Sequence, residues 1–189
     1  MNELVIIKLG GSVLTNKNIP FSLRKKDFDR LISEIALSTK SKKGLIVSHG
    51  GGSFAHADAV KYSINSRNDS NKSIQGLSSV AYGVSQLNYL VTTGLIKNGV
   101  NVIKFSPSSF IFSKNDVVKD ILTKHVLKAL SLNLIPIVHG DIVFDDEKNF
   151  TIFSTEKVIA SLLPAIKEAN KYKNIRMYLA QQIGPKFGA

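Results

Sequence analysis

His-Gly-Gly-Gly-Ser-Phe-Ala-His, residues 49–56, follows the short apolar run from Leu45 to Val47. A short apolar run bounded by glycine is typical of a strand that is buried on both faces. Three consecutive glycines cost conformational entropy on folding, so a loop with only a structural role rarely contains them. We therefore interpret this stretch as a functional loop at the end of a buried strand.

The glycines of this loop suit the binding of a phosphate group. Without a Cβ, the N–H groups of Gly50, Gly51 and Gly52 can approach phosphate oxygens closely, and Ser53 follows them. A helix that begins near His56 would add a favourable dipole. His56 is then a candidate hydrogen-bond donor to the phosphate, with a surface or packing histidine as the alternative. His49, at the end of the strand, is expected to be structural.

Three further buried runs occur along the chain, and segments with a helical spacing of apolar residues separate them. The runs extend over Leu4 to Leu9, Val100 to Phe105 and Ile135 to Val138. The helical faces extend over Phe28 to Ala36, Leu77 to Leu95 and Val118 to Leu130. Strands that alternate with helices predict an α/β fold: a three-layer sandwich with a mainly parallel central sheet and helices on both faces.

Two segments depart from this alternation. Ile142 to Phe153 contains two apolar runs around a polar centre and predicts a β-hairpin, after which Ser154 is expected to cap a helix that reaches Leu163. The polar segment from Ser63 to Ser73 is predicted to be an exposed loop. After Pro164 the helical pattern weakens, and Ile175 to Ala180 is a candidate strand. We accordingly divide the chain into a main lobe, residues 1–163, and an atypical C-terminal tail, residues 164–189.

The composition favours a cytoplasmic protein that binds small molecules. The 189 residues include no cysteine, which excludes disulfides and thiolate metal sites, and there is no apolar run of the roughly 20 residues that a membrane helix needs. The formal net charge is +11, which attracts phosphorylated ligands. The lysines are scattered, without a basic arm or an RNA-recognition pattern, so we expect no nucleic-acid partner.

A second glycine loop follows the first predicted strand, at Lys8-Leu9-Gly10-Gly11-Ser12. In open α/β sheets, ligands bind at the carboxyl ends of the strands, so this loop is expected beside residues 49–56. Gly10, Gly11 and Ser12 can offer backbone N–H groups to phosphate oxygens, and Lys8 adds a positive charge. The alternative is a tight turn with an exposed lysine.

The fourth predicted strand ends in His139-Gly140-Asp141, at the same edge. Asp141 could orient a lysine, approach a metal ion or only form a turn. The chain contains neither the Walker phosphate loop nor the Rossmann glycine pattern. Glycine loops at separate strand ends indicate two phosphates held from two sides, as transfer between two phosphorylated molecules requires.

Together these motifs resemble the amino-acid-kinase superfamily and, within it, the isopentenyl phosphate kinases. The likeness covers about residues 4–160 and is carried by residues 5–17, by residues 49–56, where Ala55 replaces a glycine of the family motif, and by the hairpin from Gly140 to Ile152. The resemblance implies transfer of the γ-phosphoryl group of ATP, with Mg²⁺, to isopentenyl phosphate. It also implies a homodimer.

The resemblance assigns roles to the motif residues. Lys8 would stabilise the transferring phosphoryl group, His56 would bind the acceptor phosphate, and Asp141 would hold the lysines in place. The nucleotide phosphates would contact Gly10, Gly11, Ser12 and Lys17. The acceptor phosphate would contact Gly50, Gly51, Gly52, Ser53 and His56. No metal site built by protein side chains is expected.

Two departures from the family pattern leave alternatives open. Ser154-Thr155-Glu156-Lys157 stands where the family usually has Ser-Gly-Asp-Asp. Gln181-Gln182-Ile183-Gly184 stands where the family continues into a Thr-Asp-x-Asp-Gly motif and a C-terminal nucleotide-binding lobe. One alternative is a shortened or non-catalytic chain that binds a phosphorylated ligand. Another is a phosphotransferase that resembles the fosfomycin kinases.

Overall fold

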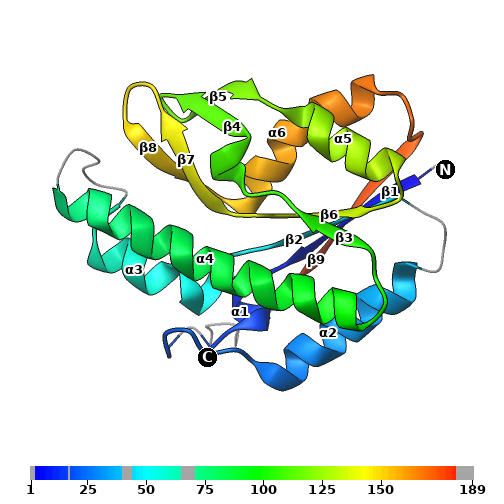
Figure 1. The fold of residues 1–189 in the computed structure, drawn as a ribbon, viewed down its shortest axis with the longest axis horizontal. Helices are drawn as coiled ribbons and strands as arrows, with labels where there is room; N and C mark the ends of the chain where they lie inside the picture. Colours follow the sequence, from blue (N-terminus) through cyan, green and yellow to red (C-terminus); the bar gives the residue numbers. More distant parts are fainter. Residues whose placement is uncertain (1–2, 17, 40–43, 65–70, 182–189) are drawn as a thin grey trace, which may run out of the picture.

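Five parallel strands form the centre of the fold in the computed structural model, which describes residues 3–16, 18–39, 44–64 and 71–181 (Figure 1). Their order across the sheet is β3-β6-β2-β1-β9. All four neighbouring pairs are parallel, as the alternation of strands and helices predicts. The strands are β1 (Glu3–Leu9), β2 (Gly44–His49), β3 (Val102–Lys104), β6 (Ile135–His139) and β9 (Asn174–Ala180).

Helices cover both faces of this sheet (Figure 1). One layer contains α1 (Gly11–Leu14), α2 (Lys25–Ser38), α3 (His56–Lys61) and α4 (Asn71–Lys97). The other contains α5 (Thr123–Ser131) and α6 (Thr155–Glu168). Because side chains alternate along a strand, Leu45 and Val47 of β2 pack in the core on the α2 and α4 side, whereas Ile46 packs on the α5 and α6 side. The predicted three-layer α/β sandwich is confirmed.

A second, four-stranded sheet lies on the α5 and α6 side, in the order β5-β4-β7-β8. It contains the predicted hairpin, formed by β7 (Asp141–Asp145) and β8 (Asn149–Phe153). The carboxylate of Asp145 accepts five hydrogen bonds, from the Ser113 hydroxyl and from the N–H groups of Asn115, Asp116, Glu147 and Lys148. Burial alone raises the pKa of Asp145, but these bonds outweigh it and hold that pKa well below its usual range.

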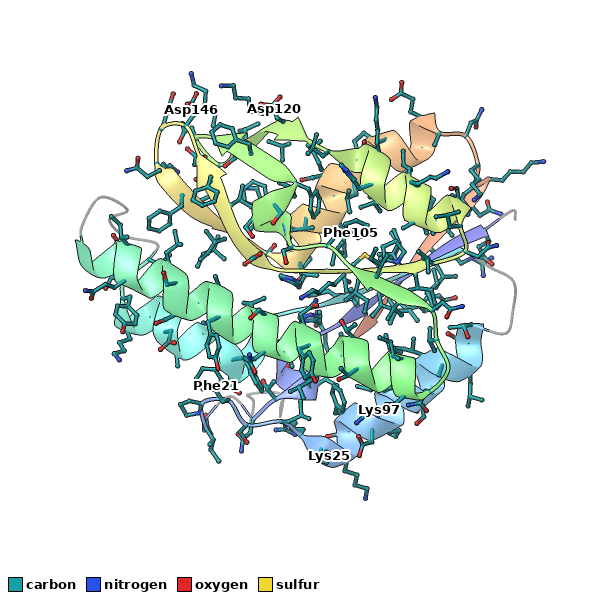
Figure 2. The ribbon with its side chains drawn as sticks, in the orientation of Figure 1. Phe21, Lys25, Lys97, Phe105, Asp120 and Asp146 are labelled. Carbon is teal, nitrogen blue, oxygen red and sulfur yellow. The ribbon has the colours of Figure 1, made fainter. Side chains whose placement is uncertain are left out.

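The other two strands of this sheet, β4 (Ile111–Lys114) and β5 (Val117–Ile121), correct the predicted helix over Val118 to Leu130. Asn115 and Asp116, with φ of 50° and 64°, form a tight turn that returns the chain as a β-hairpin. The helix begins only at Thr123. Figure 2 shows Asp120 and Asp146 at this end of the molecule, with Phe21 and Lys25 on the opposite side.

Two other expectations about the elements need correction. The exposed loop predicted from Ser63 to Ser73 is wrong at both ends, because Ile64 is fully buried and α4 already begins at Asn71; residues 65–70 lie outside the described residues. Regular structure also continues past Pro164, since α6 reaches Glu168. Pro164 lies on the exposed side of α6, where water can satisfy the carbonyl group that a proline leaves without a donor. The candidate strand from Ile175 to Ala180 is confirmed within β9.

The register of the central strands brings the three predicted loops to one edge. Leu9 is paired with His49, and His49 is paired with His139, so β1, β2 and β6 end side by side. The glycines that follow each strand therefore begin at the same level of the sheet. No helix in the described residues has both the length and the apolar character needed to cross a membrane.

Candidate functional site

The two glycine loops touch each other backbone to backbone. A Cβ placed on Gly11 would lie 2.5 Å from the nitrogen of Gly52, which is closer than atoms can approach. Gly52 has a φ of +51°, and a Cβ there would lie 2.3 Å from the Thr15 hydroxyl. That hydroxyl accepts a hydrogen bond from the Ser53 N–H at 2.9 Å and donates to the Gly11 carbonyl. Glycine is therefore required at both positions for the loops to meet.

The contact between the loops leaves a group of N–H donors available. Gly11 and Ser12 are the first residues of α1, whose initial N–H groups have no partner within the helix. Within the described ranges, the N–H groups of Gly51 and Gly52 also donate to no other protein atom. Converging N–H groups of this kind form a concave site for an anion. The predicted phosphate-binding character of both loops is consistent with this geometry.

A cavity of about 500 Å³ lies on one side of this contact. Its polar end contains Lys8, Gly50, Gly51, Gly52, His56, Asp141 and Glu156. Its other end is apolar and is built by Ala59 and Val60 of α3, Val80 and Val84 of α4, and Ile152 of β8. We call this the acceptor cavity. A ligand that fits it has an anionic head and a short apolar body.

A second cavity, of about 450 Å³, lies on the other side of the contact. Its lining consists of Lys8, Gly10, Gly11, Ser12, Gly52, Ser53, His56 and Gln181. We call this the nucleotide cavity. Lys8, Gly52 and His56 line both cavities, so they lie where a group could pass from one to the other.

Lys8 has a carboxylate partner at this junction. Its side chain comes from the end of β1, is 8% exposed, and forms an ion pair with Glu156, the second residue of α6. Ser154 caps that helix, as predicted, by accepting a hydrogen bond from the Lys157 N–H at 3.2 Å. Partial burial raises the pKa of Glu156, but the hydrogen bond from Lys8, the charge of Lys8 and the hydrogen bonds at the start of α6 together outweigh burial, so this pKa lies below its ordinary value.

The structure gives Asp141 a different environment from the one that the resemblance implies. Its carboxylate accepts hydrogen bonds from the Ser108 hydroxyl at 3.0 Å and from the Ile142 N–H at 2.9 Å. Asp141 lines the acceptor cavity with Lys8, but the carboxylate bound to Lys8 is that of Glu156. The ion pair of Lys8 in the described residues is with Glu156, and a role of Asp141 in holding a lysine stays a prediction.

The remaining predicted residues are placed as follows. Ser53 lines the nucleotide cavity instead of the acceptor cavity, and its hydroxyl lies within hydrogen-bond distance of the Ser22 backbone. His56 is the first residue of α3, is exposed, and lines both cavities. Lys17, predicted to contact the nucleotide, lies outside the described residues.

Sequence reasoning missed three contributors to the site. Glu156 was noted only as a departure from a family pattern, although its carboxylate binds Lys8. Thr155 is buried, and its hydroxyl connects the Gly140 N–H at 3.0 Å with the His49 carbonyl at 2.9 Å. Gln181 lines the nucleotide cavity directly after β9. The only sequence signal near Glu156 and Thr155 was the capping pattern at Ser154, which predicted that a helix begins there.

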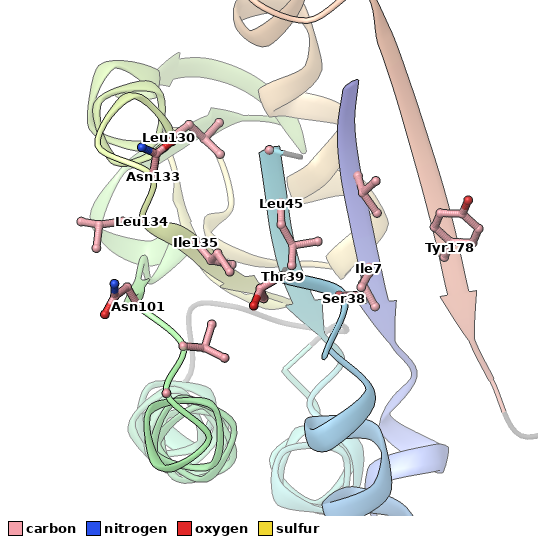
Figure 3. Close-up of a pocket in the computed structure, with 14 residues that line it drawn as sticks. Ile7, Ser38, Thr39, Leu45, Asn101, Leu130, Asn133, Leu134, Ile135 and Tyr178 are labelled. Atoms are coloured by element: carbon pink, nitrogen blue, oxygen red, sulfur yellow. The ribbon is translucent and has the colours of Figure 1, made fainter. Parts of the chain in front are cut away.

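A larger cavity, of about 750 Å³, lies elsewhere, at the amino ends of the strands (Figure 3). Ile7, Leu45, Ile135 and Tyr178 line it, and Figure 3 shows these side chains along the sheet face. It contains none of the predicted phosphate-binding residues. Because its lining contains no charged side chain, we assign the chemistry to the two smaller cavities and not to this larger one.

Comparisons with known proteins agree with this fold. Residues 3–169 match the sequence profile of the Amino acid kinase family. The chain is 30% identical over 175 residues to an isopentenyl phosphate kinase of Methanocaldococcus jannaschii, covering 87% of this chain and 65% of that protein. It is 28% identical over 163 residues to an isopentenyl phosphate kinase of Methanothermobacter thermautotrophicus, covering 82% and 60% of the two chains.

A solved structure of an isopentenyl phosphate kinase superposes on the chain with a TM-score of 0.82 at 25% identity, covering 95% of this chain and 72% of the other. The chain spans somewhat less than two thirds of the length of the Methanocaldococcus jannaschii and Methanothermobacter thermautotrophicus proteins. The profile match extends over nearly the whole of the described chain, including both glycine loops, and on that basis the chain belongs to the amino acid kinase family.

Proposed function

We propose that this protein is a small-molecule phosphate kinase that transfers the γ-phosphoryl group of ATP to isopentenyl phosphate and forms isopentenyl diphosphate. The observation that carries the proposal is the junction of the two cavities, because Lys8, Gly52 and His56 line both of them. A phosphoryl group that moves between two phosphates needs such a shared set of donors. The similarity to proteins named isopentenyl phosphate kinase supports this choice of acceptor.

The acceptor cavity supports a ligand of this type. The N–H groups of Gly51 and Gly52, with His56, face a phosphate monoester at the polar end. The aliphatic wall of Ala59, Val80 and Ile152 suits a short hydrocarbon, which gains about 25 cal/mol per Å² of apolar surface removed from water. A cavity of about 500 Å³ is of small-molecule size, so we propose a metabolite and not a nucleic acid as the partner.

The nucleotide cavity suits the phosphates of ATP. Gly11 and Ser12 offer the free N–H groups at the start of α1, and Lys8 supplies a positive charge. Mg²⁺ would arrive bound to the ATP phosphates and neutralise part of their charge. In the described ranges no three His, Asp or Glu side chains are grouped so as to hold a metal ion.

The reaction needs no covalent enzyme intermediate. An oxygen of the acceptor phosphate attacks the γ-phosphorus of ATP, a new P–O bond forms, and the bond from that phosphorus to the β,γ-bridging oxygen breaks to release ADP. Lys8 and the N–H group of Gly52 stabilise the charge on the group in transit, because both line the two cavities. Glu156 holds the Lys8 ammonium in place before the substrates bind.

We also propose a homodimer that forms through α4. Tyr82, Tyr89 and Ile96 recur every seven residues and are 60%, 60% and 55% exposed, which gives α4 an apolar stripe on the outside of the molecule. No charged residue occurs from Ser73 to Ile96. A chain with a net charge of +11 can therefore bring two copies of this stripe together without repulsion across the contact.

The second candidate function is phosphate binding without catalysis. It is favoured by the ion pair between Glu156 and Lys8, since this carboxylate could bind the Lys8 ammonium in place of a phosphoryl group. In either case, we assign both phosphate loops to the lobe formed by residues 1–163, and residues 164–189 to a C-terminal segment. We also place the protein in the cytoplasm, where ATP is available.

A turnover assay distinguishes these functions. Purified protein is incubated with Mg-ATP and isopentenyl phosphate, and phosphorus NMR follows the formation of a diphosphate and of ADP. The kinase proposal expects both products in equal amounts, and loss of both in Lys8→Met. Binding of isopentenyl phosphate without any diphosphate would instead establish the non-catalytic alternative.

A further inference from the structure

Strands β2 and β6 end in the same dipeptide, His-Gly, and the two histidines form a buried pair. His49 and His139 are neighbours in the register of the parallel strands. Their rings stack with centroids 5.3 Å apart and planes inclined by 26°. His49 is fully buried and His139 is 2% exposed. The pair takes no part in the transfer described above, although the glycine that follows each histidine lines the acceptor cavity.

Each ring makes the same hydrogen bond to the glycine that follows it. Nδ1 of His49 lies 3.1 Å from the carbonyl oxygen of Gly50, and Nδ1 of His139 lies 3.1 Å from the carbonyl oxygen of Gly140. A carbonyl oxygen can only accept, so Nδ1 carries the hydrogen in both rings. At the end of both strands, the same hydrogen bond from Nδ1 of the histidine thus holds the carbonyl group of the following glycine.

The far side of the His49 ring fixes its protonation state. Nε2 of His49 lies 3.0 Å from Nδ2 of Asn88, an amide nitrogen that can only donate, so Nε2 is the acceptor. The Thr92 hydroxyl donates to Oδ1 of Asn88 at 3.3 Å and so keeps the amide in this orientation. His49 is therefore neutral, with its hydrogen on Nδ1. Burial agrees with this, because it is the main cause that lowers the pKa of His49 to about 3.

The hydrogen bond to Gly50 determines where the next N–H group points. In a trans peptide the C=O and N–H groups point in opposite directions. The Gly50 carbonyl points toward the buried ring, so the N–H of Gly51 points to the opposite side, where Gly50 and Gly51 line the acceptor cavity. That N–H donates to no protein atom within the described ranges. At the second strand, His139 holds the Gly140 carbonyl and Thr155 accepts from the Gly140 N–H, so the peptide groups on both sides of Gly140 are fixed ahead of Asp141.

We propose that His49 and His139 are positioning residues: a buried, stacked pair that holds the Gly50 and Gly140 carbonyl groups and thereby aims the Gly51 N–H at the phosphate of the acceptor. The inference rests on the proposed function in taking a phosphate as the ligand of this cavity. Neither ring touches the reacting atoms, so the pair acts through the backbone. Its loss should weaken acceptor binding while leaving ATP binding unchanged.

Two variants of His49 with similar polarity separate this role from simple packing. The side-chain N–H₂ of asparagine can take the place of Nδ1 and still donate to the Gly50 carbonyl. The longer side chain of glutamine reaches toward the place of Nε2 and keeps the contact with Asn88 instead. Calorimetric titrations with inorganic phosphate, isopentenyl phosphate and Mg-ATP are compared for wild type, His49→Asn and His49→Gln, with thermal melts as a check of folding.

We expect His49→Asn to bind both phosphate ligands within about threefold of wild type and His49→Gln to bind them about 10- to 100-fold more weakly, as loss of one hydrogen bond to a charged group predicts. Mg-ATP affinity should not change in either. Equal effects of the two variants on phosphate binding, or an equal loss of Mg-ATP affinity, would overturn the positioning role.

A measurement on the unaltered protein tests the same proposal if either variant fails to fold. Nitrogen NMR of the histidine rings should show Nδ1 protonated and Nε2 unprotonated for His49 at neutral pH, and an imidazolium or the other tautomer would overturn the proposal. Failure of wild type to bind isopentenyl phosphate, while it binds inorganic phosphate, would count against the proposed acceptor and not against the histidine pair.

Discussion

Gly11 lies against Gly52 so closely that the two glycine loops are in direct backbone contact, with 2.5 Å between the Gly52 nitrogen and the position of a Cβ on Gly11. The nucleotide cavity and the acceptor cavity meet at this contact. Under the proposed function, the distance between the two phosphates would therefore be set by main-chain atoms, which side-chain motion cannot change. The proposed reaction depends on this rigidity, because phosphoryl transfer relies on positioning.

Replacing Gly11 with alanine should separate the two loops. The added Cβ must displace the Gly52 backbone, and a misplacement of about 1 Å can lower the rate about 100-fold. We expect kcat/KM for isopentenyl phosphate to fall by about that factor while the fold survives. Steady-state kinetics and circular dichroism measure the two effects.

Gly94→Ala is the matched control for this substitution. A Cβ on Gly94 of α4 would lie 3.4 Å from the side chains of Ile32 and Phe28, and alanine is favoured over glycine within a helix by up to about 1 kcal/mol. Its activity should equal that of wild type. Unchanged activity in Gly11→Ala would show that the contact between the loops does not set the geometry of transfer.

Removing the carboxylate that holds Lys8 should lower the rate more than the binding of substrates. In Glu156→Gln the Lys8 ammonium loses its charged partner and samples other positions. We expect kcat to fall by about tenfold with a KM for Mg-ATP within about threefold of wild type, since Glu156 lines the acceptor cavity and not the nucleotide cavity. Asp29→Asn removes the exposed ion pair with Lys25 and serves as the control. A gain of activity in Glu156→Gln would mean that Glu156 competes with the phosphoryl group for Lys8.

The buried histidine pair should make the protein less stable in mild acid. The pKa of His49 is about 3 in the folded chain and ordinarily 6.5, so below about pH 6.5 the unfolded chain binds a proton that the folded chain does not. Stability is therefore lost as the pH falls, by about 2 kcal/mol from His49 alone between pH 7 and pH 5. Burial lowers the pKa of His139 in the same direction. Denaturant titrations at both pH values measure the loss, which should shrink in His49→Asn; an equal loss in the variant would exclude His49 as its source.

The apolar stripe on α4 predicts the oligomeric state. In an antiparallel pair of α4 helices around a two-fold axis, Tyr89 would lie near its own copy, so Tyr89→Lys would bring two positive charges together. We expect wild type to sediment as a dimer and this variant as a monomer in analytical ultracentrifugation. Leu132→Lys, on the other side of the sheet at an equally exposed position, should remain dimeric. A wild-type monomer would contradict the proposed interface.

The features that could be predicted from the sequence are those with a local signal. Apolar runs such as Leu4 to Leu9 indicate buried strands, and glycines directly after them indicate loops at the carboxyl edge. Because parallel strands share one edge, these local signals also predicted that Lys8, Gly52 and His56 come together, and all three line the same cavities. Repeating patterns along the chain were enough for the sheet and for most of its helices.

The features that could not be predicted depend on distant partners or on competing local patterns. The pairing of Lys8 with Glu156 joins residues 148 positions apart, and no sequence pattern indicates it. Val118 and Ile121 fit a helical face, yet the turn at Asn115 and Asp116 makes them part of a hairpin whose loop is held by the buried carboxylate of Asp145. The continuation of α6 past Pro164 depends on which side of the helix meets water, and that is known only after the core is packed.

The most direct test of the central claim, that two glycine loops hold two phosphates on either side of one contact, is calorimetric titration with isopentenyl phosphate and, separately, with Mg-ATP. Each titration is repeated on His56→Ala, and isopentenol serves as the matched ligand without a phosphate. The account predicts that wild type binds both phosphorylated ligands at one site each, does not measurably bind isopentenol, and loses at least about tenfold in acceptor affinity in the variant. Binding of isopentenol as tight as that of isopentenyl phosphate, or no binding of either phosphorylated ligand, would contradict it.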